Sequence, residues 1–165
     1  MAIATRRRKA SDGLKVKGAY HLQIVDPDGR IVGDSGWRSN VIVNLGFDQY
    51  LARALGAITG SKQVSHMAIG SGTAPGAADT ALSSEVTGTN PRSTVAAASS
   101  ANSKGVRFTA TFWSSQSFIG ATVTLSNLGL VNSSSVGTLF CGNTFASSQC
   151  QTNQNVNGTY DVTFS

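Results

Sequence analysis

The segment VRFTATF at residues 106–112 decides the fold class, because its apolar and polar residues alternate strictly. A repeat of two residues places the apolar side chains on one face of an extended chain and the polar ones on the other, as in a half-buried β-strand. Residues 121–125, with the sequence ATVTL, alternate in the same way. Both segments therefore predict strands of a sheet that packs one face on a core.

Further segments of strand-like composition lie on both sides of this one, separated by Gly, Ser and Asn residues. They are residues 18–25, 30–32, 37–43, 64–69, 92–99, 121–131, 138–145 and 159–164. The sequence DPDG at residues 26–29 is typical of a β-turn and predicts a hairpin between the first two segments. Short strands at this spacing predict a mainly-β domain, an antiparallel β-sandwich of jelly-roll-like type.

One segment has a helical period instead. From residue 44 onward the apolar residues recur every three or four positions and form one continuous stripe. They are Phe47, Tyr50, Leu51, Ala54, Leu55 and Ile58. We predict one amphipathic helix near residues 44–56, which ends at Gly56 or Gly60.

The charge is concentrated in an N-terminal arm at residues 1–17. The chain has 165 residues, of which only 13% are charged, and a net charge of +5. The arm carries six basic residues against one acid, namely Arg6, Arg7, Arg8, Lys9, Lys15 and Lys17. Residues 18–165, the predicted single β-sandwich domain, hold equal numbers of bases and acids. The arm fits a phosphate backbone or an acidic protein surface, without aromatic residues to read bases, and a solvated tail is the alternative.

Two motifs suggest an enzyme but lack the residues that the chemistry requires. GDSG at residues 33–36 resembles the nucleophile segment of trypsin-like proteases, yet only His21 precedes it, so a catalytic triad has no source. The Gly-rich segment from Gly70 to Gly76 has the wrong spacing for a dinucleotide loop, and no amphipathic helix follows it directly. We predict a protein that is not an enzyme, with no catalytic residues and no cofactor.

The two cysteines, Cys141 and Cys150, offer no metal site. Their spacing is not that of a zinc motif, and His21 and His66 are remote from them in sequence. Two free thiols are the expectation for a protein made in the cytoplasm, and a disulfide across a short hairpin is the alternative if the protein ends up outside the cell. No apolar run is long enough to span a bilayer, and no secretory signal is expected.

Four segments carry a resemblance to a known family. They are residues 18–32 (GAYHLQIVDPDGRIV), 36–48 (GWRSNVIVNLGFD), 66–75 (HMAIGSGTAP) and 78–86 (ADTALSSEV). In this order they resemble a family of small tailed-bacteriophage virion structural proteins, in which a Trp-x-x-Asn-x-Ile-x-Asn-x-Gly segment leads into a helix and a Gly-rich loop follows. The resemblance covers residues 18–165 and implies a tail, fibre or head-associated role. The arm lies outside it.

The extended loop at residues 70–91 is the candidate inter-subunit contact. Its glycines permit close backbone approach, Asp79 is placed to cap a turn, and Leu82 is placed to anchor the far end on the body. A loop ordered in this way would present main-chain groups to a neighbouring subunit, and a flexible excursion is the alternative. The candidate residues are Gly70, Gly72, Pro75, Asp79, Leu82 and Glu85.

We therefore expect a non-enzymatic subunit of a tailed-phage virion, made in the host cytoplasm, most specifically a tail or head-to-tail component that assembles as a symmetric oligomer. Its partners would be copies of itself and other virion proteins. A first alternative is a capsid decoration, cement or coat subunit whose arm contacts the capsid or packaged DNA. A second is a host- or glycan-binding tip module in which Trp37, Trp113 and Tyr20 stack on a sugar, although aromatic residues in strands are more often core.

Overall fold

The alternating segment forms strand β8 (Gly105–Phe112) of a computed structural model that describes residues 15–99 and 104–165. Phe108, Ala110 and Phe112 are buried, whereas Arg107 and Thr109 face solvent. The alternation of apolar and polar residues thus gives β8 one buried apolar face and one polar face, as predicted.

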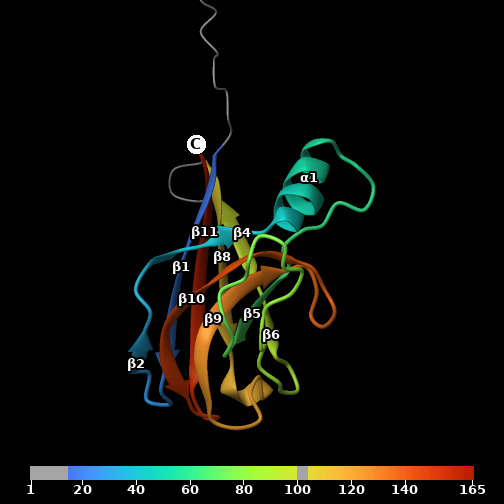
Figure 1. Cartoon of the computed structure of the whole chain (residues 1–165). Helices are drawn as coiled ribbons and strands as arrows, with labels where there is room; N and C mark the ends of the chain where they lie inside the picture. Colours follow the sequence, from blue (N-terminus) through green and yellow to red (C-terminus); the bar gives the residue numbers. More distant parts are fainter. Residues whose placement is uncertain (1–14, 100–103) are drawn as a thin grey trace, which may run out of the picture.

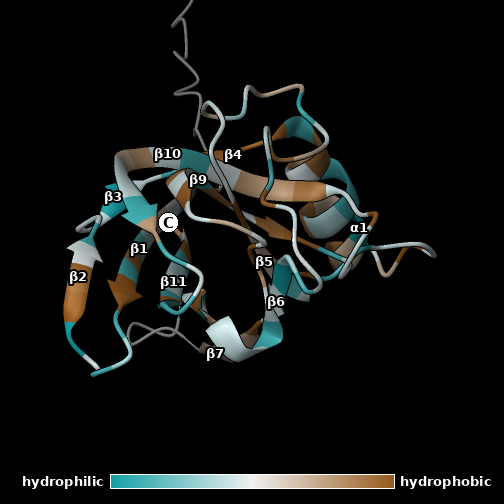
Figure 2. Ribbon diagram, turned by 90° about the horizontal axis from the view of Figure 1, so that it is seen from below, coloured by the Kyte–Doolittle hydropathy of each residue, from teal (hydrophilic) through white to brown (hydrophobic). Residues whose placement is uncertain are grey.

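Two antiparallel sheets pack face to face (Figure 1), which confirms the predicted antiparallel β-sandwich. Sheet A has the order β2 (Ile31–Asp34), β1 (Val16–Val25), β11 (Asn155–Phe164), β8 and β7 (Ala96–Ser99), with β3 (Arg38–Ser39) also paired to β1. Sheet B has the order β4 (Val41–Ile42), β10 (Leu139–Cys150), β9 (Val123–Val131), β5 (His66–Gly70) and β6 (Arg92–Thr94). Figure 2, which looks along the strands, shows β9 and β10 in one layer and β1 and β11 in the other.

The main core lies between the sheets. Sheet A contributes Tyr20, Leu22 and Ile24 from β1, and sheet B contributes Met67 and Leu128, all almost fully buried. The Tyr20 ring stacks on that of Tyr160 with 5.7 Å between ring centroids. The suggestion that Tyr20 stacks on a sugar is therefore wrong, because the even positions of β1 face the core.

Most predicted strands are present, with shifted ends. Between β1 and β2, the Asp26 carboxylate accepts hydrogen bonds from the backbone N–H groups of Asp28 and Arg30, and Gly29 has φ 82°, which confirms the predicted turn. Residues 92–99, predicted as one strand, form β6 in sheet B and β7 in sheet A, because the chain crosses between the sheets at Val95.

The helical segment lies at the predicted place but has a different geometry. Residues 46–52 form a π-helical segment, η1 (Gly46–Ala52), which continues into the short α1 (Arg53–Leu55). The hydrogen bonds of η1 span five residues rather than four, so this segment is wound more widely than an α-helix. Tyr50 is buried, but Phe47 is 45% and Leu55 91% exposed, so the apolar stripe is only partly buried against the core.

Both thiols are free and buried, as expected for a protein kept reduced. Cys141 and Cys150 lie nine residues apart on β10, and a strand advances about 3.3 Å per residue, so their separation far exceeds what a disulfide spans. Burial raises the pKa of Cys141 to about 12 and that of Cys150 to about 11, because it disfavours the thiolate.

The boundary between arm and body falls earlier than residue 17. Lys15 pairs with Ser165 through two backbone hydrogen bonds, and Lys17 lies within β1, where it pairs with Thr163. Arg6, Arg7, Arg8 and Lys9 lie outside the described residues. Within residues 15–99 and 104–165, no helix is long and apolar enough to cross a membrane.

Candidate functional surfaces

The Gly-rich loop at residues 71–91 covers the outer face of sheet B. Leu82 is 6% exposed and packs in a second, smaller core with Val43, Ala68, Val131 and Leu139. The anchoring role expected of Leu82 is confirmed.

Close backbone approach within the loop explains its glycines. A side chain at Gly72 would place Cβ 2.4 Å from the Ser83 backbone oxygen, and one at Gly70 would place it 2.5 Å from the Ser84 oxygen. Pro75 is buried against Gly142. These contacts are all made within the chain.

Side chains of β9 hold the same loop by its backbone. The Asn127 amide donates to the carbonyl oxygens of Ser83 at 2.8 Å and Thr73 at 3.2 Å, and the Ser126 hydroxyl donates to Gly72 at 2.9 Å. The Asp79 carboxylate accepts the Gly76 N–H at 2.8 Å and so caps a turn, as predicted. Many of the main-chain groups that were expected to face a neighbouring subunit are thus occupied inside the chain.

Glu85 makes the most enclosed ion pair among the described residues. Its carboxylate oxygens accept from Arg92 Nε at 2.5 Å and Nη2 at 2.9 Å, and Arg92 Nη1 donates to the Ser133 carbonyl. The Arg92 and Glu85 side chains are 7% and 17% exposed. This bidentate pair ties the end of the loop to β6 and has the geometry of a structural contact.

The GDSG segment covers the last two residues of β2 and the start of the turn that follows it. The Ser35 hydroxyl accepts the Leu22 N–H at 2.9 Å and donates to the Gly36 carbonyl, so both of its hydrogen-bonding functions are engaged locally. His21 contacts Asp34 at 2.6 Å rather than Ser35. Hydrogen bonds from Gln23, the Gly36 N–H and His21 lower the Asp34 pKa to about 2. Among the described residues, no His, Cys, Asp and Glu cluster suits a metal ion.

An apolar groove lies between the helix and the end of sheet A. It has a volume of about 470 Å³, and its walls are Val16, Phe47, Leu51, Ala52, Ala54, Leu55 and Phe164. A second apolar hollow of about 370 Å³ continues under Tyr50 and Leu51. Because Val16 and Phe164 lie at the ends of β1 and β11, the groove lies where the N-terminal arm joins the body. The sequence did not predict the groove, because the groove exists only where the apolar residues of the helix stay exposed.

A basic surface surrounds Trp37 on the outer face of sheet A. A hollow of about 680 Å³ there is lined in part by Lys17, Arg38 and Arg107, and also by Asp161, which forms an ion pair with Arg107. Trp37 is 52% exposed, stacks on His21 at 5.6 Å and has the Arg107 guanidinium 5.8 Å from its ring centroid. Aromatic rings and charged side chains therefore lie close together beside β1. The exposure of Trp37 confirms that it is outside the core.

Comparison of the sequence with protein-family models, with curated proteins and with solved structures finds no match.

Proposed function

We propose that the chain is a non-enzymatic structural subunit of a tailed-bacteriophage virion, a tail or head-to-tail component that assembles with copies of itself. The sequence resemblance supports the virion role, and the apolar groove beside the helix supports self-assembly. The groove is the observation that carries the proposal, because a solvent-facing apolar hollow of this size is typical of an interaction site.

The occupant that fits the groove is a second copy of the chain. Leu55, which lines the groove together with Val16 and Phe164, is 91% exposed, and Ile58, three residues further along the chain, is 53% exposed. An apolar projection and an apolar hollow on one surface allow copies to bury each other's side chains in a repeated contact. The neutral body adds no net repulsion between copies.

A charge at the tip of this projection tests the proposal. We expect the purified chain to sediment as a defined oligomer and Leu55→Asp to sediment as a monomer, because the carboxylate would be buried without a partner. Val136→Asp is the matched control, since Val136 is also 91% exposed and lies outside the groove. A monomeric wild-type chain at high concentration, or an oligomer that survives Leu55→Asp unchanged, would contradict self-assembly through this groove.

The virion role has a separate test. An antibody against the body should label one fixed location on intact particles by electron microscopy, and mass spectrometry of purified particles should detect the chain. Absence of the chain from purified particles would refute the virion role whatever its oligomeric state.

The basic surface around Trp37 favours a second candidate, a capsid decoration, cement or coat subunit whose arm contacts packaged DNA or an acidic capsid surface. Lys17 and Arg38 extend the positive charge of the arm onto the body, whereas Arg107 is paired with Asp161 in the same hollow. Contacts to phosphates would release counterions, so duplex DNA affinity should fall steeply with added salt.

Deletion of residues 1–14 separates the arm from this surface. The deletion ends before Lys15 so that the backbone hydrogen bonds between Lys15 and Ser165 are kept. We expect it to abolish binding to a short duplex DNA, as measured by fluorescence anisotropy at low salt. Unchanged affinity after the deletion would place the DNA contact elsewhere, and no affinity in the full chain would remove this candidate for DNA.

A further inference from the structure

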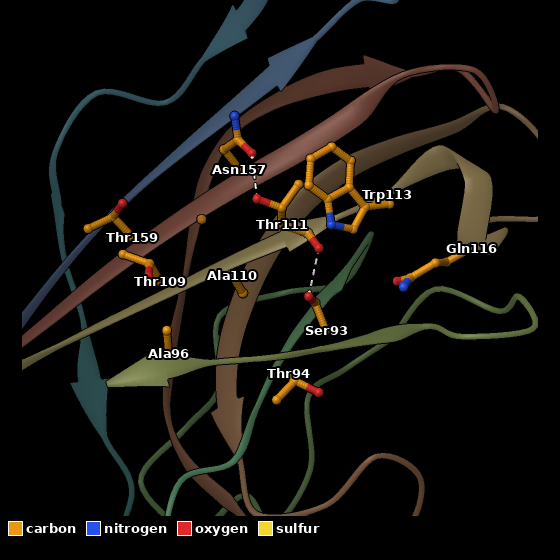
Figure 3. A pocket seen from close by; sticks show the side chains of 11 residues that line it. Ser93, Thr94, Ala96, Thr109, Ala110, Thr111, Trp113, Gln116, Asn157 and Thr159 are labelled. Carbon is orange, nitrogen blue, oxygen red and sulfur yellow. Dashed lines mark hydrogen bonds between the residues drawn. The ribbon is translucent and has the colours of Figure 1, made fainter. Parts of the chain in front are cut away.

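A neutral polar pocket lies on the outer face of sheet A at its β7 edge, beside Trp113 (Figure 3). It has a volume of about 550 Å³, within the usual range for small-molecule sites. It forms because β7 begins at Ala96, which pairs with Thr109 of β8. The residues before Ala96 belong to β6 of sheet B, so the rest of β8 has no partner strand on this side. The pocket is distinct from the apolar groove and from the basic surface around Trp37.

Trp113 is held in place at the end of β8 although its side chain is 50% exposed. The next residue, Ser114, donates its N–H to the Asn155 side chain at 2.8 Å, and the following 3₁₀ turn η2 (Ser114–Gln116) is closed by the Gln116 N–H to the Trp113 carbonyl. Phe118, 1% exposed, fixes the far side of the turn in the core. A ring presented by an anchored backbone loses little freedom when a ligand stacks on it.

The remaining walls of the pocket carry hydroxyl and amide groups and no charge. The polar side chains are Ser93, Thr94, Thr109, Thr111, Gln116, Asn157 and Thr159, and the other lining residues are alanine, glycine and Trp113. Figure 3 shows them around the indole, with Asn157, Thr109 and Thr159 to its left, Gln116 to its right, and Ser93 and Thr94 below it. They come from neighbouring strands in register, since Asn157 is paired with Thr111 and Thr159 with Thr109.

Internal hydrogen bonds orient part of this set and leave part of it for a ligand. The Thr111 hydroxyl donates to Asn157 Oδ1 at 2.9 Å, which directs the two amide hydrogens of Asn157 elsewhere, and the Ser93 hydroxyl donates to the Thr111 carbonyl at 2.7 Å. Within the described residues, the hydroxyls of Thr109 and Thr159 form no side-chain hydrogen bond. The pocket therefore offers both donors and acceptors next to an aromatic surface.

This combination selects among ligand classes. A phosphate or a nucleic acid strand would find no cation in the pocket, and a purely apolar ligand would leave hydroxyl and amide groups without partners. A neutral pyranose has an apolar face of C–H groups and a rim of hydroxyls. The first matches the indole, and the second matches the Thr and Asn side chains.

We infer that the pocket beside Trp113 binds a neutral saccharide, with the pyranose ring stacked on the indole and its hydroxyls bonded to Asn157, Thr109 and Thr159. The inference goes beyond the proposed assembly role and uses none of the residues of the groove, so either can fail without the other.

The experiment is a titration of the full chain with neutral methyl pyranosides of glucose, galactose and N-acetylglucosamine, followed by two-dimensional ¹H–¹⁵N NMR. The chain has two tryptophans, so two indole N–H signals report separately on Trp113 and Trp37. We expect at least one pyranoside to shift the Trp113 signal and the Asn157 amide signals, with a Kd on the order of 1 mM, while the Trp37 signal stays in place.

Trp37→Ala is the matched control for Trp113→Ala, because the two side chains are 52% and 50% exposed on the same sheet. Trp113→Ala should weaken binding at least about tenfold, and Trp37→Ala should leave it unchanged. Asn157→Ala, followed through the Trp113 signal, should also weaken it. Absence of shifts with every pyranoside, or equal binding by folded Trp113→Ala, would overturn the inference.

Discussion

The outer faces of the two sheets differ in what covers them. The outer face of sheet B carries Ala68, Val131 and Leu139, and the chain covers it with its own loop through Leu82. The outer face of sheet A carries threonine, asparagine and charged side chains in register, and no segment of the described residues packs across it except the short stretch at Trp37. Within one sandwich, the outer face of sheet B is covered by the chain itself and the outer face of sheet A is exposed.

The Gly-rich loop is packed against its own chain. Gly70, Gly72, Pro75 and Leu82 contact the chain itself, and Asn44 in the helix-leading segment donates its N–H to Ala77 of the loop. The helix-leading segment and the Gly-rich loop are thus adjacent parts of one packed layer. The groove beside the helix and the outer face of sheet A remain exposed.

The largest expected effect is on the closed face. Leu82→Ala should lower the free energy of unfolding by about 3 kcal/mol, because it leaves a cavity in the small core over sheet B. Leu55→Ala, at a residue 91% exposed, should change it by less than about 0.5 kcal/mol in a monomeric background. Urea unfolding measures both. Equal effects of the two substitutions would mean that the loop does not close the face of sheet B.

Intermediate effects on the free energy of unfolding are expected from two bidentate ion pairs, one on each sheet. Glu85→Gln should cost about 2 kcal/mol, because it leaves the enclosed Arg92 without its counter-charge. Asp161→Asn breaks the pair of Arg107 with Asp161 on the open face, where Arg107 is 44% exposed, and should cost less than about 1 kcal/mol. Chemical denaturation of both variants checks the order. A larger loss of unfolding free energy for Asp161→Asn than for Glu85→Gln would contradict the view that the face of sheet B is closed and that of sheet A exposed.

The smallest expected effect is a pH dependence at the edge of sheet B. Burial, and then the charge of Arg92, lower the pKa of His66 below its ordinary value of about 6.5. The unfolded chain therefore takes up this proton at higher pH than the folded chain, and stability should fall slightly as the pH drops below about 6.5. His66→Gln should reduce this slope in urea titrations at several pH values. A stability that rises on acidification through the same window would contradict the lowered pKa.

Sequence patterns predicted the positions of strands and turns better than they predicted which side chains are buried. The alternation in β8 and the DPDG turn are local signals, and both predictions are confirmed. Alternation defines two faces of a strand but does not say what lies over each of them. For this reason Tyr20 was grouped with Trp37 and Trp113, although Tyr20 is buried and the two tryptophans are half exposed.

The errors have the same physical origin, tertiary contacts that override local patterns. Part of the helical stripe stays exposed, and the π-helical segment begins at Gly46, which approaches the Phe140 carbonyl so closely that a side chain there would place Cβ 2.2 Å from its oxygen. The crossing at Val95 splits one predicted strand between two sheets, and nothing in its composition marks it. The pocket beside Trp113 arises from that crossing and so had no local signal.

Hydrogen exchange followed by mass spectrometry tests the central claim most directly, namely that the helix end forms the contact between copies and the Gly-rich loop closes the fold. The comparison is between the wild-type chain and Leu55→Asp. We predict that amides in residues 44–58 exchange more slowly in the wild-type assembly than in the variant, and that amides in residues 71–91 exchange equally in both. Faster exchange of residues 71–91 in the variant, with residues 44–58 unchanged, would contradict the account.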